Sequence, residues 1–167
     1  MLQPSESLVA SASPDGGISS DGRDSAPPTL AEKRAALYDI SARTVYMPDG
    51  TRLEAHSGLG ELMDDPMHVH VRNRGATPPQ VYELTMRERP FHGVEALRMK
   101  PVGQGDLFGR SGLLTHSYLM GPKGDSNGCV SFKDYAAFVQ AYKAGAVKLL
   151  IVVPSLADSV VVTAQKS

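Results

Sequence analysis

The sequence has a single cysteine, no tryptophan and no excess of charge of either sign among its 167 residues. One cysteine, Cys129, excludes an internal disulfide and every zinc or iron–sulfur site built from several cysteines. Seventeen basic against eighteen acidic residues give a formal net charge of -1, so the chain lacks the positive field with which proteins hold nucleic acid. The longest aliphatic run, Leu149–Val153, is far shorter than a membrane span. We therefore expect no nucleic-acid partner and no membrane span.

The first 28 residues contain few aliphatic side chains and are rich in serine, proline and glycine. Such a segment buries too little apolar surface to offset the entropy of ordering it, so we predict a flexible arm over residues 1–28. Its first ten residues lack a basic stretch followed by an apolar core, which predicts synthesis in the cytoplasm without a signal peptide. A short helix and linker are expected over 29–43, and the main domain over 44–167.

Two helices are predicted. Thr29 and Glu32 have the spacing of a capping box, which indicates a helix over residues 30–37. Ser131 is the expected N-cap of a longer helix over about 132–144, because apolar residues recur there at helical spacing.

Short extended stretches separated by turn residues account for most of the remaining chain. Residues 44–47 and 51–55 flank Pro48-Asp49-Gly50 and predict a hairpin. Further strands are expected over 67–72, 81–87, 96–102, 113–120, 149–153 and 159–163. Their close spacing predicts a mainly β (α+β) sandwich or barrel.

The region around Cys129 contains the strongest signal for chemistry. Residues 121–124, Gly-Pro-Lys-Gly, suit a β-turn that reverses the chain. If the two arms fold back evenly about Pro122 and Lys123, His116 lies opposite Cys129 in an antiparallel pair. Opposed Cβ atoms are about 4.5 to 5.5 Å apart, within reach of an imidazole–thiol hydrogen bond.

A free cysteine with a pKa near 8.5 is only a few per cent thiolate at neutral pH, so a nucleophile needs activation. His116 is the candidate base, and the N-terminus of a helix capped by Ser131 would also favour the thiolate. The backbone N–H groups of Gly128 and Cys129 are candidate donors to an oxyanion. The alternative is a small buried cysteine without reactivity, next to an ordinary histidine of the sheet.

These residues resemble the signature of the L,D-transpeptidase catalytic domain, in which a His-Ser pair precedes Ser/Thr-His-Gly-Cys. His116-Ser117 and Ser126-Asn127-Gly128-Cys129 match that order, and residues 77–82 resemble the family's Thr-Pro element. Asn127 replaces the usual histidine, which favours the L,D-transpeptidase-like effectors of type VI secretion systems over housekeeping enzymes. Further segments that resemble these effectors are 56–58, 64–66, 91–94, 109–116 and 126–135. The resemblance covers about residues 44–153.

The resemblance implies a cysteine L,D-carboxypeptidase or L,D-transpeptidase that acts on the tetrapeptide stems of peptidoglycan. Cys129 would attack the carbonyl of the third residue and release D-alanine, with His116 as the base and the Ser117 carbonyl orienting the imidazole. The acyl acceptor stays open between water, a D-amino acid and a second stem. No cofactor is implied. Ser126 and Asn127 would belong to the loop that precedes the nucleophile.

An effector of this type implies action in the periplasm of a target bacterium, together with secretion components and a cognate immunity protein. The sequence leaves two alternatives: a housekeeping enzyme of the producer's own wall, and a non-catalytic wall-binding or metal-binding module. The metal-binding module rests on His68 and His70, which a strand would place on one face, with His56 or His92 as a third ligand. We otherwise expect no metal site.

Arg110, Tyr118 and His92 are candidates for substrate contacts. Arg110 lies six residues before His116, where a guanidinium can bind a terminal carboxylate, although a solvated arginine is the simpler interpretation.

Overall fold

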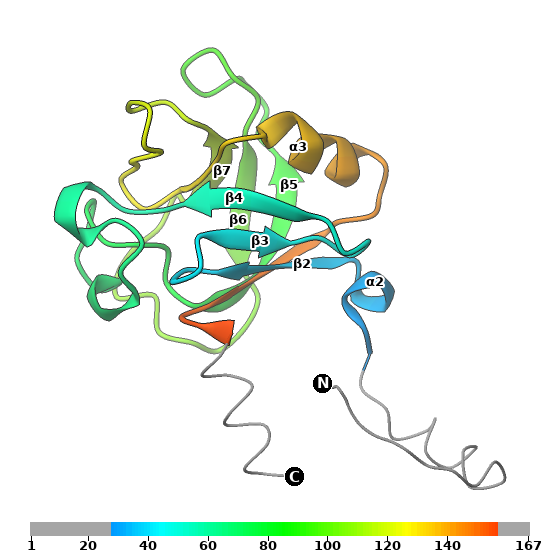
Figure 1. Cartoon of the computed structure of the whole chain (residues 1–167), viewed down its shortest axis with the longest axis horizontal. Helices are drawn as coiled ribbons and strands as arrows, with labels where there is room; N and C mark the ends of the chain where they lie inside the picture. Colours follow the sequence, from blue (N-terminus) through cyan, green and yellow to red (C-terminus); the bar gives the residue numbers. More distant parts are fainter. Residues whose placement is uncertain (1–27, 157–167) are drawn as a thin grey trace, which may run out of the picture.

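The structure is a computed structural model that describes residues 28–156 (Figure 1). Apart from its last residue, the predicted arm lies outside this range, as does the strand predicted over 159–163. Among the described residues no helix is long and apolar enough to cross a membrane.

Eight strands form a closed barrel, which confirms the prediction of a mainly β fold. Around the barrel the order is β2-β3-β4-β8-β7-β6-β5-β9, and β9 closes it by pairing with β2 in parallel. In chain order the strands are β2 (Ala35–Asp39), β3 (Thr44–Tyr46), β4 (Arg52–His56), β5 (Gln80–Met86), β6 (Leu97–Pro101), β7 (Leu114–Ser117), β8 (Val130–Phe132) and β9 (Leu149–Val153). The helical elements are α2 (Leu30–Lys33), η1 (Gly60–Leu62), η2 (Pro66–His68) and α3 (Tyr135–Lys143).

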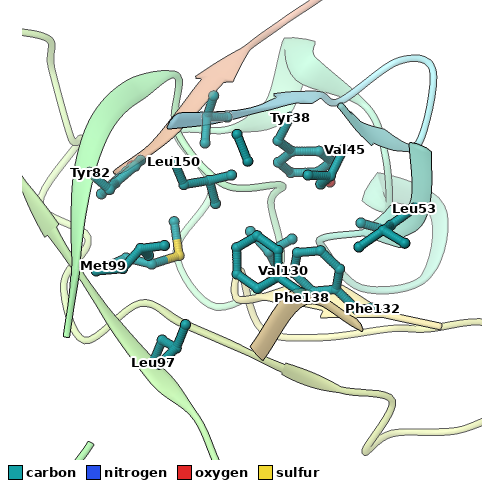
Figure 2. Close-up of a cluster of buried hydrophobic side chains, with 14 of the residues drawn as sticks. Tyr38, Val45, Leu53, Tyr82, Leu97, Met99, Val130, Phe132, Phe138 and Leu150 are labelled. Carbon is teal, nitrogen blue, oxygen red and sulfur yellow. The ribbon is translucent and has the colours of Figure 1, made fainter. Parts of the chain in front are cut away.

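The barrel interior is filled by alternate residues of the strands, as the period of two requires (Figure 2). Tyr38, Tyr82 and Phe132 are among the largest side chains that are fully buried. Helix α3 adds Phe138, whose ring stacks on that of Phe132 with centroids 4.3 Å apart. Because the interior faces are occupied by the core, a site on β7 or β8 has to lie on the outer face.

The first predicted helix is shorter than expected. The capping box of Thr29 and Glu32 is present, but α2 ends at Lys33, and Arg34 takes a left-handed conformation. Residues 35–39, predicted as helix and linker, form β2 instead. The carbonyl of Arg34 accepts hydrogen bonds from the N–H groups of Lys148 and Leu149, so sheet pairing with β9 replaces further helix.

The strand predicted over residues 67–72 is wrong. Asp65 caps the 3₁₀ helix η2 by accepting a hydrogen bond from the Met67 N–H, and the chain then continues through turns. Alternating polar and apolar residues gave the misleading signal, whereas the preceding Asp-Pro pair initiates a turn.

The N-terminus of the second helix is also corrected. Asp134 is the N-cap of α3 and accepts a hydrogen bond from the Ala137 N–H, while Ser131 lies in β8. Three strand residues therefore separate Cys129 from the turn that precedes α3, and the expected activation of its thiol by the helix N-terminus is wrong.

Candidate active site

His116 and Cys129 are brought together by a parallel pair of strands, not by the antiparallel pair that the turn suggested. His116 of β7 pairs with Ser131 of β8, and Thr115 pairs with Val130. Val130 belongs to the core, so the alternating residues Cys129 and Ser131 face outward, together with His116. The even fold-back about residues 122 and 123 is wrong because the loop before Cys129 returns the chain to the start of β8.

A cavity of about 230 Å³ on this outer face is lined by both His116 and Cys129. Phe91 and His92 contribute from one loop, and Ser126 and Asn127 from the loop that precedes the cysteine. The remaining lining residues are Asn73, Ser111, Gly112, Leu113, Leu119 and Met120. This wall is largely apolar or uncharged and contains no carboxylate.

The imidazole of His116 is fixed in one tautomer by its neighbour. Its Nδ1 lies 2.6 Å from the backbone carbonyl oxygen of Ser117, so Nδ1–H donates and Nε2 is left as the proton acceptor. Burial lowers the pKa of His116 below its ordinary value, and the charge of His92 adds to this, against the opposing effect of the Ser117 carbonyl. His116 is therefore neutral at pH 7 and has the form that a general base requires.

Phe91 packs against the base from a tight hairpin. Its ring stacks on the His116 imidazole with centroids 5.7 Å apart, and Phe91 pairs with Val94 in an isolated antiparallel bridge. The two residues between them, His92 and Gly93, both have positive φ, as in the two-residue turns that hairpins prefer. The turn thus places His92 in the wall of the cavity. The contact of Phe91 with His116 is not predicted by the sequence pattern.

The thiol of Cys129 is not a thiolate at rest. Burial raises its pKa, while a backbone hydrogen bond from Leu114 and the charge of Arg110 oppose that shift. Cys129 and His116 line the same cavity, but no hydrogen bond joins the thiol to the imidazole among the described residues. With both groups neutral, a nucleophile at Cys129 would have to form by transfer of the thiol proton to a base.

Ser126 holds the loop that precedes Cys129. Its Oγ donates to the Cys129 carbonyl at 2.6 Å and accepts hydrogen bonds from the N–H groups of Gly58 and Gly128. Of the two N–H groups expected as oxyanion donors, that of Gly128 is therefore already engaged. Asn127 is exposed, and its side-chain amide donates to the Asn73 carbonyl.

Gly128 is required because Arg110 lies directly against it. A Cβ atom on Gly128 would overlap the Arg110 guanidinium, and Gly128 also has a φ of +128°. Arg110 is only 6% exposed, which contradicts the interpretation as a solvated arginine. Its terminal nitrogens donate to four backbone carbonyls, those of Val69, Gly75, Ala76 and Asn127.

A buried hydrogen-bond chain connects the core to the same loop. The Tyr38 hydroxyl bonds with Ser57 Oγ, which accepts from the Thr77 N–H, and Thr77 Oγ1 donates to the Gly128 carbonyl at 2.6 Å. Thr77, the first residue of the Thr-Pro element, therefore holds Gly128, the residue before Cys129.

A second histidine, His56, lies on the other side of Ser131 in the same row of the sheet. Its Nδ1 is 2.7 Å from an Asp64 oxygen and its Nε2 is 2.8 Å from a Glu54 oxygen. The Tyr118 hydroxyl also donates to Glu54, at 3.2 Å. Burial alone would lower the pKa of His56, but the hydrogen bonds and charges of the two carboxylates together raise it.

The histidines considered as metal ligands do not converge. His68 Nδ1 forms a hydrogen bond with Asp65, and the His68 and His70 rings stack on each other in the segment of turns that replaces the predicted strand. Within residues 28–156, no group of three or more histidine, cysteine or acidic side chains is placed to hold a metal ion.

Comparison with known proteins matches the chain to a family model. Residues 51–156 match the family model described as the Tlde1 domain, which covers β4 to β9 and every residue of the cavity described above. No curated protein matches the chain.

Proposed function

Because the chain belongs to the Tlde1-domain family of type VI secretion effectors, we propose that it is a cysteine L,D-carboxypeptidase or L,D-transpeptidase that shortens peptidoglycan tetrapeptide stems. The observation that carries the proposal is the shared cavity of Cys129 and His116, in which His116 has a fixed tautomer and an available Nε2. The family implies secretion into target cells and an immunity partner. The proposed place of action is the periplasm of the target.

The chemistry follows from the neutral pair. His116 Nε2 takes the thiol proton as Cys129 Sγ bonds to the carbonyl carbon of the third stem residue. When the tetrahedral intermediate collapses, the carbon–nitrogen bond breaks and Nε2–H returns its proton to the amine of D-alanine. Water, or the amine of a D-amino acid, then attacks the thioester carbonyl carbon while His116 Nε2 takes its proton. The carbon–sulfur bond breaks and Nε2–H returns the proton to Cys129 Sγ, which releases a tripeptide after hydrolysis or a new tetrapeptide after exchange. Arg110 favours the developing thiolate by its charge.

Isolated muropeptides test the proposal. Incubation with the protein is expected to convert tetrapeptides to tripeptides, as measured by mass spectrometry. Cys129→Ala and His116→Ala are each expected to abolish this conversion while circular dichroism shows that the barrel is intact. Added D-amino acid distinguishes the acceptors: a new tetrapeptide mass indicates exchange, and tripeptide alone indicates hydrolysis. Tetrapeptides that the wild-type protein leaves unchanged would overturn the substrate assignment.

A further inference from the structure

A second, smaller cavity adjoins the one that contains Cys129. It has a volume of about 160 Å³ and shares Asn73, Ser111, Leu113 and Asn127 with the larger cavity. Its own lining residues are Arg72, Gly109 and Arg110. We call this smaller cavity the arginine recess.

The arginine recess has no negative charge in its wall. Neither cavity is lined by aspartate or glutamate, whereas Arg72 and Arg110 both line the recess. Arg110 bonds only to neutral carbonyls, and within the described residues its Nε–H has no hydrogen-bond partner. A buried guanidinium without a carboxylate is unusual, because burial of a charge is normally compensated by a charge of opposite sign.

Arg72 has a free side chain at the rim. It is exposed, and no ion pair or hydrogen bond of its guanidinium is found among residues 28–156. The hydroxyl of Ser111, also exposed at this wall, has no partner in that range either. By contrast, the carboxylates of Glu54 and Asp64 are engaged by His56. The recess therefore offers positive charge and unused donors next to the nucleophile.

We propose that the arginine recess binds a carboxylate of the same peptide whose carbonyl Cys129 attacks, with the Arg72 guanidinium as its main donor. A planar guanidinium suits a carboxylate because two parallel N–H groups meet both oxygens. The buried charge of Arg110 adds attraction from the wall. This inference rests on the proposed function and deepens it, because it assigns a residue that selects peptides by their negative charge.

The test compares Arg72→Gln with wild type on the tetrapeptide and on tetrapeptides amidated in turn at each carboxylate. On the unmodified peptide we expect Arg72→Gln to lower kcat/KM roughly ten- to a hundredfold, mainly through KM. Amidation of the recognised carboxylate is expected to lower wild-type kcat/KM by a similar factor and to remove the difference between the two proteins. The amide that does so identifies the carboxylate. Arg72→Lys is expected to recover part of the loss.

Arg74→Gln is the matched control, because Arg74 is an exposed arginine two residues away that lines neither cavity. It is expected to stay within twofold of wild type. The inference is overturned if Arg72→Gln equals wild type on the unmodified peptide, if it loses the same factor on every amidated peptide, or if Arg74→Gln loses as much.

A binding measurement separates this inference from the proposed function. Calorimetry measures the Kd of the unmodified tetrapeptide for the Cys129→Ala protein without any turnover. In the Cys129→Ala protein that also carries Arg72→Gln, the Kd is expected to be roughly ten- to a hundredfold higher. If wild type cleaves no peptide but this loss of binding is seen, the proposed function fails, and the proposal that the arginine recess binds a carboxylate is supported. If wild type cleaves tetrapeptide and Arg72→Gln changes neither binding nor KM, only the recess is overturned.

Discussion

Two buried histidines on the outer face of the barrel have opposite electrostatic surroundings. His116 and His56 flank Ser131 in one row across β7, β8 and β4, and they are 3% and 7% exposed. His116 bonds to one backbone carbonyl and lines a cavity without carboxylates, whereas His56 bonds to two carboxylates. The same residue type, buried at both positions, is thus neutral in one place and favoured as the cation in the other.

The difference suits the two histidines to different roles, proton transfer for His116 and structural support for His56. A neutral imidazole with an available Nε2 accepts a proton, which is what a reaction at Cys129 needs. The His56 imidazole, favoured as the cation by Asp64 and Glu54, holds the segment after β4. Gly58 of this segment in turn contacts Ser126 in the loop that precedes Cys129. We therefore expect substitutions of His116 to affect turnover and substitutions of His56 to affect stability.

The largest effect is expected for His116→Gln. Glutamine keeps a polar side chain of similar size but cannot accept the thiol proton, so kcat should fall by about a thousandfold or more. Thermal unfolding should change less than turnover, because the substitution alters only the hydrogen bond to the Ser117 carbonyl and the ring contact with Phe91. Tetrapeptide turnover and thermal unfolding, followed in parallel, check both parts. A stable variant with near wild-type turnover would remove His116 from the mechanism.

His56→Gln is expected to cost about 2 kcal/mol of stability or more, because it leaves the buried Asp64 carboxylate with only the more distant Arg43 guanidinium, 3.8 Å away, as a charged partner. Since the pKa of His56 is raised in the folded protein, its contribution is fully present below the unfolded pKa and is lost as pH rises through the folded pKa. The difference in Tm between wild type and His56→Gln should therefore be larger at pH 6 than at pH 9. An equal difference at both pH values would contradict a charged His56.

The pH dependence of turnover distinguishes His116 from His56, because only the pKa of His116 is expected to set it. Because burial lowers the pKa of His116, the neutral base persists to lower pH than for a free histidine, whose pKa is about 6.5. The acidic limb of kcat/KM should lie below pH 6.5, and His56→Gln should not move it. An acidic limb above pH 6.5 would indicate that His116 is stabilised as a cation, as His56 is.

The smallest effect is expected for Ser131→Ala. Ser131 lies between the two histidines, and its buried hydroxyl has no hydrogen-bond partner among the described residues. Removing it should change stability by less than about 1 kcal/mol and leave kcat within twofold. Denaturant unfolding and tetrapeptide turnover measure this. A large loss of turnover with unchanged stability would show that the hydroxyl couples the two histidines.

Much of the fold could be predicted from periodicity and turn residues. The hairpin of β3 and β4 and the strands β5, β6 and β9 follow from local patterns, and the capping box of α2 is present. The predictions failed where distant pairing decides the outcome. Pairing with β9 makes β2 a strand, and pairing with β7 places Ser131 in β8 instead of at a helix N-terminus.

The candidate site could likewise be predicted only where residue type and local motif identify its members. Cys129 and His116 are identified by residue type and motif, and both line one cavity. The parallel register that brings them to one face depends on a loop closure that local turn chemistry cannot specify. Thr77 and Phe91 contact this site from elements about 25 to 50 residues away, so spacing alone gave them no role.

The most direct test of covalent catalysis is mass spectrometry of the protein quenched during reaction with tetrapeptide, followed by peptide mapping. The account predicts a tripeptidyl adduct on the fragment that contains Cys129, formed by wild type and absent from Cys129→Ala and His116→Gln. Turnover of tetrapeptide that persists in Cys129→Ala, or an adduct that forms equally well in His116→Gln, would contradict it.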